Sequence, residues 1–335
     1  MGDTMEIVGV ALTDALIPIS KMLISQEDKD QKAAKALSGI LGDALLGIEF
    51  VVSETEQKGL VSIGNGLWKN EYAVPFAVAV KENAKEANLL GAKYAFCSSV
   101  EGDERVWEYA RHPFMQIHVV SDVAWSICNY YNCSGDDEFM VQYGMEMLYE
   151  ICKYWLSRVE KDERGYVINQ VTGTDEHHPY VDNNAYTNYV VHYMAKRTLE
   201  LTEQYGEQLS SVREKTDATD AFIKEIEDLV ANIYLPMEKK TGMIPQFDDY
   251  FGLSRDLEVV GGNQAKAFQM KASGLYHKSQ VIKQPDVLVL FAYQNMEFPA
   301  LVYKRNWDYY RARCEASSSL SYSVHSICAS DMDEP

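Results

Sequence analysis

Apolar residues recur at helical spacing along most of this chain from about residue 116 onward. A stripe of apolar positions every three to four residues is typical of a helix that buries one face. The 208–235 segment shows this most clearly, because Phe222, Ile226 and Leu229 fall on one side. The pattern predicts helices over 117–132, 138–160, 184–205, 208–235, 284–295 and 318–330, and a weaker, glycine-interrupted helix over 31–52.

Two long connections, 160–184 and 236–279, lack this periodicity and are rich in Gly, Pro, Asp and His. Long ordered loops on a helical scaffold are uncommon unless they bind or catalyse something. No low-complexity or Pro-rich linker divides the chain, although a weaker break falls near 53–75. Periodicity alone therefore predicts a mostly helical protein whose chemistry lies in its loops.

The charge balance narrows the classes of partner. The formal net charge is −19, from 31 basic and 50 acidic side chains. Nucleic-acid binding depends on neutralising phosphates with Lys and Arg, so this balance argues against nucleic acid as a partner. The 22 Tyr and 5 Trp would suit sugar rings, but ordinary helix packing explains them more simply.

The N-terminal residues and the cysteines indicate the cellular compartment that the sequence predicts. The first residues carry no basic region of a secretory signal, and Asp14, Pro18 and Lys21 interrupt the apolar stretch over 5–25. The six cysteines form no CxxC pair, and zinc-type spacing is absent. We therefore expect no membrane span, and a cytoplasmic protein with reduced, mostly buried thiols.

The 171–188 stretch is the densest polar segment, with Asp175-Glu176-His177-His178 at its centre. Glu176 beside two imidazoles could belong to a metal site, act as a proton donor in a cleft, or simply meet water. A metal site needs ligands from elsewhere, and none of the other histidines, at 112, 118, 192, 277 and 325, forms a His-x-x-x-His pair. We therefore expect no metal and no organic cofactor, while the donor and solvent interpretations stay open.

This segment resembles the general-acid segment of glycoside hydrolase family 65, which contains disaccharide phosphorylases and related α-glucosidases. Members carry Gly-Pro-Asp-Glu-Tyr-His and then Val-Asp-Asn-Asn-Ala-Tyr-Thr-Asn. The matching positions here are Gly173, Asp175, Glu176, His178 and all of 181–188, while Thr174 replaces Pro and His177 replaces Tyr. The resemblance implies an all-α fold, an (α/α)6 toroid of the six-hairpin glycosidase type. It also implies that Glu176 protonates the departing glycosidic oxygen and that Asp175 contacts the substrate.

A second matching segment is Gln280-Val-Ile-Lys-Gln-Pro-Asp286, where members carry Gln-x-x-Lys-Gln-Ala-Asp. The resemblance implies that Lys283 and Gln284 bind the glucosyl hydroxyls, although a Lys at a helix start can also lack any ligand. Further upstream, His118 lies in Gln116-Ile-His-Val119, which also resembles the family. It is expected either to face the sugar or to be structural.

A third segment decides the type of reaction. Phosphorylases of the family carry Arg-Thr-x-His-x-Ser-Ser-Leu-Ser, whose His and serines receive phosphate at a helix N-terminus. Ser318 and Ser319 match these serines, but Ala316 occupies the histidine position and Glu315 precedes it. A carboxylate repels a phosphate dianion but can deprotonate water, so Glu315 is predicted to be the base of an inverting hydrolase. Complementing the helix dipole is the alternative role of Glu315.

The resemblance covers about residues 85–330 and breaks down in two places. The family's Phe-Trp-Asp-Thr-Glu should follow Gly64, but 67–72 contains no Asp, and the Trp-Glu expected near 96–98 reads Phe-Cys-Ser. We therefore expect an incomplete toroid, with a helical segment over 1–55 and a partial catalytic domain over 56–335. Inverting cleavage of an α-glucosidic bond by water is the favoured function. The alternatives are a maltose- or kojibiose-type phosphorylase releasing β-glucose 1-phosphate and an inactive sugar-binding remnant, and a homodimer is one assembly to test.

Overall fold

The computed structural model describes residues 60–64, 67–70, 73–99, 102–105, 115–260, 263–293, 298–315 and 319–332. The α-helices in it are α3 (Ala73–Glu86), α5 (Val119–Ser134), α6 (Asp137–Phe139), α7 (Met145–Arg158), α8 (Ala185–Tyr205), α9 (Ser210–Lys215), α10 (Asp220–Asn232), α11 (Gln264–Ser273), α12 (Asp286–Tyr293), α13 (Ala300–Arg311) and α14 (Ser319–Asp331). A π-helical turn, η1 (Met140–Gly144), leads into α7, and the 3-10 turns are η2 (Gly206–Leu209), η3 (Tyr250–Gly252) and η4 (Tyr276–Lys278). Two antiparallel hairpins complete it, β1 (Leu60–Gly64) with β2 (Leu67–Asn70) and β3 (Glu160–Asp162) with β4 (Gly165–Val167).

The predominantly helical character predicted from periodicity is confirmed, and each helix predicted from about residue 116 onward has a counterpart. One is divided: the segment predicted as a single helix over 208–235 forms η2, α9 and α10. Asp217 takes a left-handed conformation with φ 49°, and the Thr219 side chain accepts the backbone N–H of Phe222 to begin α10. Helices α3, α11 and α13 were not predicted, and α11 lies within the 236–279 stretch that was expected to be an aperiodic connection. The helical segment expected over 1–55 lies outside the described residues.

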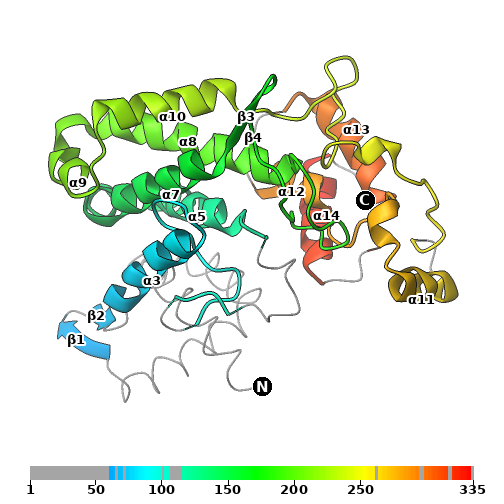
Figure 1. The fold of residues 1–335 in the computed structure, drawn as a ribbon, viewed down its shortest axis with the longest axis horizontal. Coiled ribbons are helices and arrows are strands. Elements are labelled where there is room, and N and C mark those ends of the chain that lie inside the picture. Colours follow the sequence, from blue (N-terminus) through cyan, green and yellow to red (C-terminus); the bar gives the residue numbers. More distant parts are fainter. Residues whose placement is uncertain are drawn as a thin grey trace, which may run out of the picture.

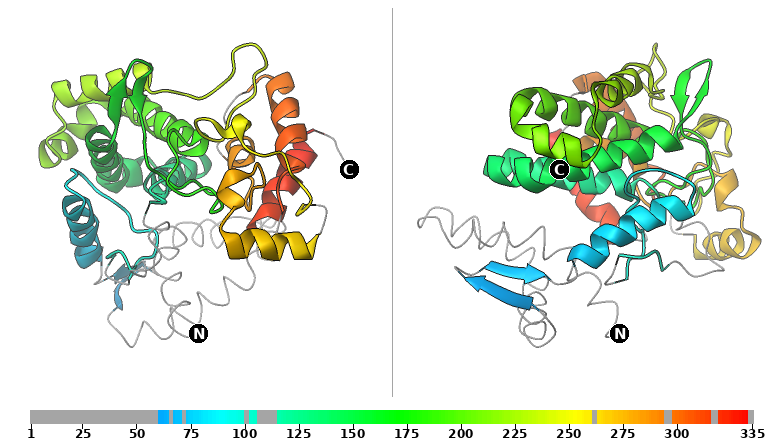
Figure 2. Two further views of the ribbon diagram at one scale, coloured as in Figure 1. Left: turned by 45° about the vertical axis from the view of Figure 1, so that its right-hand side comes forward. Right: turned by 60° about the vertical axis from the view of Figure 1, so that its left-hand side comes forward.

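Helix α8 is the element on which the two largest apolar cores meet (Figures 1 and 2). It packs against α5, α7 and α10 on one side and against α12 on the other. From its seventh residue onward it gives Val191, Met194 and Leu201 to the first core, while its first two turns give Tyr186 and Val190 to the second. Helix α8 has 21 residues, and apolar side chains lie on most of its circumference. A helix of this kind is buried on several faces, so α8 can contribute to both cores.

The segment that precedes α8 is a closed loop rather than an open connection. Val171 and Val181 exchange both backbone hydrogen bonds at 2.8 Å, which pins the base of the loop. Asn183, with φ 53°, donates its backbone N–H to Ile168 O, and its side-chain oxygen accepts the N–H of Ile168 in return. The loop tip over 172–180 is therefore presented from a fixed base beside the start of α8.

None of the helices described is both long and apolar enough to cross a membrane. The thiols of Cys128, Cys152, Cys314 and Cys328 are buried, as expected for several cysteines within apolar helical patterns, while Cys97 and Cys133 are exposed.

The central position of α8 makes its buried apolar residues sensitive to truncation. Replacing Leu201, which is fully buried, by Ala should lower the free energy of unfolding by about 2–5 kcal/mol. Lys196→Ala, on an exposed position of the same helix, should change it by less than about 0.5 kcal/mol. Urea denaturation of both variants measures the difference, and similar values for the two would contradict the assignment of α8 to the core.

Candidate functional site

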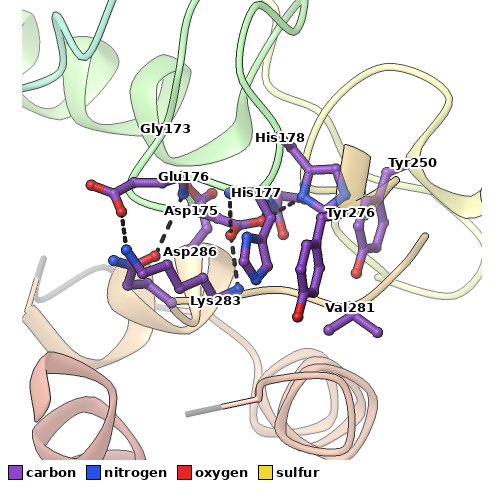
Figure 3. A network of polar contacts seen from close by, with 12 residues as sticks. Gly173, Asp175, Glu176, His177, His178, Tyr250, Tyr276, Val281, Lys283 and Asp286 are labelled. Atoms are coloured by element: carbon purple, nitrogen blue, oxygen red, sulfur yellow. Dashed lines mark hydrogen bonds and ion pairs between the residues drawn. The ribbon is translucent and has the colours of Figure 1, made fainter. Parts of the chain in front are cut away.

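A single buried carboxylate, Asp175, joins three segments that are far apart in the sequence (Figure 3). Its Oδ1 atom accepts the backbone N–H of Lys283 at 2.9 Å and that of His177 at 3.1 Å. Its Oδ2 atom accepts Nε2 of Gln246 at 2.8 Å and lies 2.5 Å from Nδ1 of His178. Because the side chain is fully buried and each oxygen has two donors, Asp175 anchors the loop.

His178 is the charged partner of Asp175 inside the core. Its Nε2 atom lies 2.8 Å from the backbone oxygen of Ser279, which can only accept, so Nε2 carries a proton. Burial lowers the pKa of His178, but the Asp175 carboxylate more than offsets this, and the net pKa is raised. Burial likewise raises the pKa of Asp175, yet the His178 charge and hydrogen bond hold it below its ordinary value. The two groups therefore form a buried carboxylate–imidazolium pair.

A second buried carboxylate, Asp286, begins helix α12 directly behind the loop. Its Oδ2 atom accepts the backbone N–H of Thr174 at 2.8 Å, and its Oδ1 atom accepts Nδ2 of Asn184, the N-cap residue of α8, at 3.1 Å. Burial first, and then repulsion from Asp175, raise the pKa of Asp286 to about 6. A Cβ at Gly173 would lie 2.3 Å from Asp286 Oδ2, so this close approach requires glycine.

The predicted acid, Glu176, extends from the anchored loop toward the 280–286 segment. Its carboxylate forms an ion pair with the ammonium of Lys283 (Figure 3), and its backbone N–H lies 3.5 Å from the amide oxygen of Gln284. The Glu176 and Lys283 side chains are 28% and 32% exposed, whereas Gln284 is almost fully buried. The structure thus brings together three residues that the sequence predicted to share a sugar site.

The neighbouring residue, His177, points to a different partner. Its Nε2 atom lies 3.0 Å from Oε1 of Glu315, and its ring stacks on Tyr276 with centroids 3.8 Å apart. The Tyr276 hydroxyl donates to Oε2 of Glu315 at 3.2 Å. Glu315 therefore contacts the residue next to the predicted acid, and both of its carboxylate oxygens have contacts within the protein. Its role as the base of a hydrolase stays a prediction.

The other predicted site residues are placed less directly. His118 is buried at the start of α5, with Nδ1 2.8 Å from Asp122 Oδ2 and its ring edge-on to Tyr186. Its Nε2 atom has no hydrogen-bond partner within the described part of the chain, so its predicted role toward sugar stays a prediction. Ser319 begins α14, while Ser318 lies outside the described residues. No group of three His, Cys, Asp or Glu side chains among the described residues is arranged to hold a metal ion.

The predicted contact of Asp175 with substrate is replaced by a structural role, because its donors all come from the protein and its side chain is fully buried. Three partners in the site were not predicted, namely Tyr276, Gln246 and Asp286. Asp286 ends the family-like segment 280–286, and Gln246 lies in Ile244-Pro-Gln-Phe-Asp248, which resembles a loop of the same family. These resemblances were the signal that could have identified both residues. Tyr276 lies in the aperiodic stretch before Gln280, where no local pattern marks it.

Comparison with known proteins gives a consistent result. Residues 72–334 match the glycosyl hydrolase family 65 central catalytic domain. The chain is 55% identical over 251 residues to a 3-O-α-D-glucosyl-L-rhamnose phosphorylase of Lachnoclostridium phytofermentans, covering 75% of this chain and 33% of that protein. It is 33% identical over 276 residues to a 1,2-α-glucosylglycerol phosphorylase of Bacillus selenitireducens, covering 76% and 36%.

A solved structure of a candidate kojibiose phosphorylase from the human microbiome superposes with a TM-score of 0.71 at 26% identity, covering 77% of this chain and 36% of that one. The catalytic domain of the matching family is an (α/α)6 barrel, which confirms the all-α toroid predicted from the sequence. The chain spans about a third of the length of these relatives.

The buried pair predicts a pH-dependent stability. Replacing His178 by Asn should lower the free energy of unfolding by about 3–5 kcal/mol near pH 6, because Asp175 is left as an unpaired buried charge. Because the pKa of His178 is raised in the folded protein, its contribution to the free energy of unfolding is full below about pH 6.5. That contribution is lost as the pH rises through the pKa of His178 in the folded state. The lowered pKa of Asp175 makes its contribution full above about pH 4 and lost as pH falls further.

The difference between wild type and His178→Asn should therefore be largest between about pH 4 and 6.5 and should shrink above that range. Urea denaturation across pH 4 to 9 measures it, with His277→Asn, at an exposed histidine, as the control. A difference that stays constant from pH 5 to pH 9 would contradict the charged pair.

Proposed function

The chain belongs to glycosyl hydrolase family 65, and on this premise we propose that it serves the phosphorolysis of an α-glucoside with inversion. The observation that carries the proposal is the meeting of Glu176 with Lys283, beside Gln284, on a loop fixed by buried Asp175. A proton donor beside hydrogen-bond donors for hydroxyl groups is the arrangement that cleavage of a glycosidic bond needs. The proposed activity is that of the relatives, and residues 72–334 of this chain match the central catalytic domain of their family.

In the proposed reaction Glu176 transfers its proton to the departing glycosidic oxygen. The bond from that oxygen to the anomeric carbon breaks, and a phosphate oxygen forms the new bond from the opposite face, giving β-glucose 1-phosphate. Lys283 forms an ion pair with the Glu176 carboxylate, so the bound glucosyl unit has to draw the ammonium to its hydroxyls, and Glu176 has to take up a proton, before it acts as the acid. Ser319, the first residue of α14, and Ser318 before it in the sequence are the proposed phosphate contacts.

We propose phosphorolysis in place of the hydrolysis that the sequence analysis favoured. The relatives named above are phosphorylases, which supports phosphate rather than water as the acceptor. The hydrolytic interpretation needs Glu315 to act as a base toward water. In the structure Oε1 of Glu315 contacts His177 and Oε2 contacts Tyr276, so both oxygens are already engaged. Because the chain is 55% identical over 251 residues to a glucosyl-rhamnose phosphorylase, 3-O-α-D-glucosyl-L-rhamnose is the first substrate to test, followed by kojibiose and maltose.

Incubation of the protein with these disaccharides, with and without inorganic phosphate, tests the proposal directly. Turnover that requires phosphate is the expected result. Glucose release independent of phosphate would restore the hydrolytic interpretation. Absence of turnover together with a thermal shift on adding glucose would favour a protein that only binds sugar.

Removal of the proposed acid should abolish most of the activity. Glu176→Gln keeps the shape of the side chain but cannot donate the proton, so kcat should fall by roughly 10²–10⁴-fold. Glu163→Gln, at an exposed position of the β3–β4 hairpin, should retain the wild-type rate. Steady-state phosphorolysis kinetics measure both, and a Glu176→Gln variant with wild-type kcat would refute the assignment.

Lys283 should affect binding of the glucoside. Lys283→Met removes the ammonium that is proposed to hold the glucosyl hydroxyls, so KM for the disaccharide should rise about tenfold or more. Lys278→Met, at an exposed lysine five positions earlier, is the matched control and should leave KM unchanged. An unchanged KM in Lys283→Met would place the sugar elsewhere.

A further inference from the structure

His177, a position at which the chain departs from its family in the acid segment, contacts Glu315, which lies next to a departure in the phosphate segment. His177 stands where members carry Tyr, and Glu315 precedes Ala316, which stands where phosphorylases carry His. The Nε2 atom of His177 lies 3.0 Å from Oε1 of Glu315 across a separation of 138 residues. A carboxylate only accepts hydrogen bonds, so Nε2 carries a proton in this contact.

Tyr276 completes a cluster of three side chains around the same carboxylate. Its hydroxyl donates to Oε2 of Glu315 at 3.2 Å, and its ring stacks on His177 with an interplanar angle of 17°. Burial, and then the charge of Glu315, raise the pKa of Tyr276 to about 12, so the hydroxyl keeps its proton at neutral pH. Both oxygens of Glu315 therefore have a donor, and the side chains of His177 and Glu315 are only 14% and 13% exposed.

The backbone places this cluster between the sugar segment and the start of α14. Glu315 donates its N–H to Ile282 O at 2.9 Å, next to Lys283, and the chain continues from Glu315 toward Ser319. A bare carboxylate at this position would repel a phosphate dianion, and the repulsion is strong where water is partly excluded. A carboxylate held by two donors presents much less negative charge.

We propose that His177, together with Tyr276, masks the charge of Glu315 so that phosphate can bind beside it. His177 is then a positioning residue for the acceptor anion, acting through Glu315, and Glu315 is not the base that activates water. This inference rests on the proposed phosphorolysis and assigns a task to the residues that distinguish this chain from the family pattern.

The test compares His177→Phe with the double variant H177F/E315Q. Phe keeps an aromatic ring against Tyr276 but removes the donor to Glu315, so the carboxylate is exposed to the anion. KM for phosphate should rise about tenfold while KM for the disaccharide stays within about twofold. The double variant, in which Gln carries no charge, should recover most of the loss in phosphate KM relative to His177→Phe. The rise in His177→Phe should also shrink at high ionic strength, because salt screens the repulsion.

His277→Phe, at the exposed neighbouring histidine, is the matched control and should alter neither KM. The rise in melting temperature on adding phosphate measures binding independently of turnover. This rise should be smaller in His177→Phe than in wild type, and most of it should return in H177F/E315Q. Equal rises in both KM values, or no recovery in the double variant, would overturn the masking of Glu315. A wild-type protein that neither turns over with phosphate nor is stabilised by it would instead overturn the proposed function, and the masking with it.

Discussion

The site depends on placing one carboxylate, Asp175, where water cannot reach it. A buried charge is costly unless it is paired and hydrogen-bonded, and Asp175 meets that condition only when three segments come together. The loop supplies His177 N–H and His178, the stretch before η3 supplies Gln246, and the segment before α12 supplies the N–H of Lys283. Removing any one of these partners leaves an unsatisfied group inside the protein. The requirement for all of them fixes the position of the loop relative to the 280–286 segment.

That anchor determines what the next residues can reach. Asp175 and His178 turn into the protein, while Glu176 extends to Lys283 (Figure 3). The His177 ring contacts Glu315. The carboxylates of Glu176 and Glu315 thus each have a cation or a proton donor beside them. In a chain with a formal net charge of −19, the proposed binding of an anionic acceptor depends on this local pairing.

Periodicity predicted most of the helices because a buried apolar stripe leaves a 3.6-residue signal, as in α8 and α10. The division of the 208–235 segment was not predicted, because its only local signs are the left-handed turn at Asp217 and the N-cap at Thr219. Both are weak signals in the sequence. Glu176, Lys283 and Gln284 were found from the motifs that carry them. The partners of Glu315 could not be found in this way, since His177 and Tyr276 reach it across 138 and 39 residues.

The most direct measurement on the anchor is the protonation state of the His178 ring, read from the ¹⁵N chemical shifts of the two ring nitrogens at pH 6.5. The account predicts that both nitrogens are protonated to a greater extent than in an exposed histidine such as His277, because the pKa of His178 is raised by Asp175. A neutral ring with a single protonated nitrogen at this pH would contradict the buried ion pair on which the arrangement of the site rests.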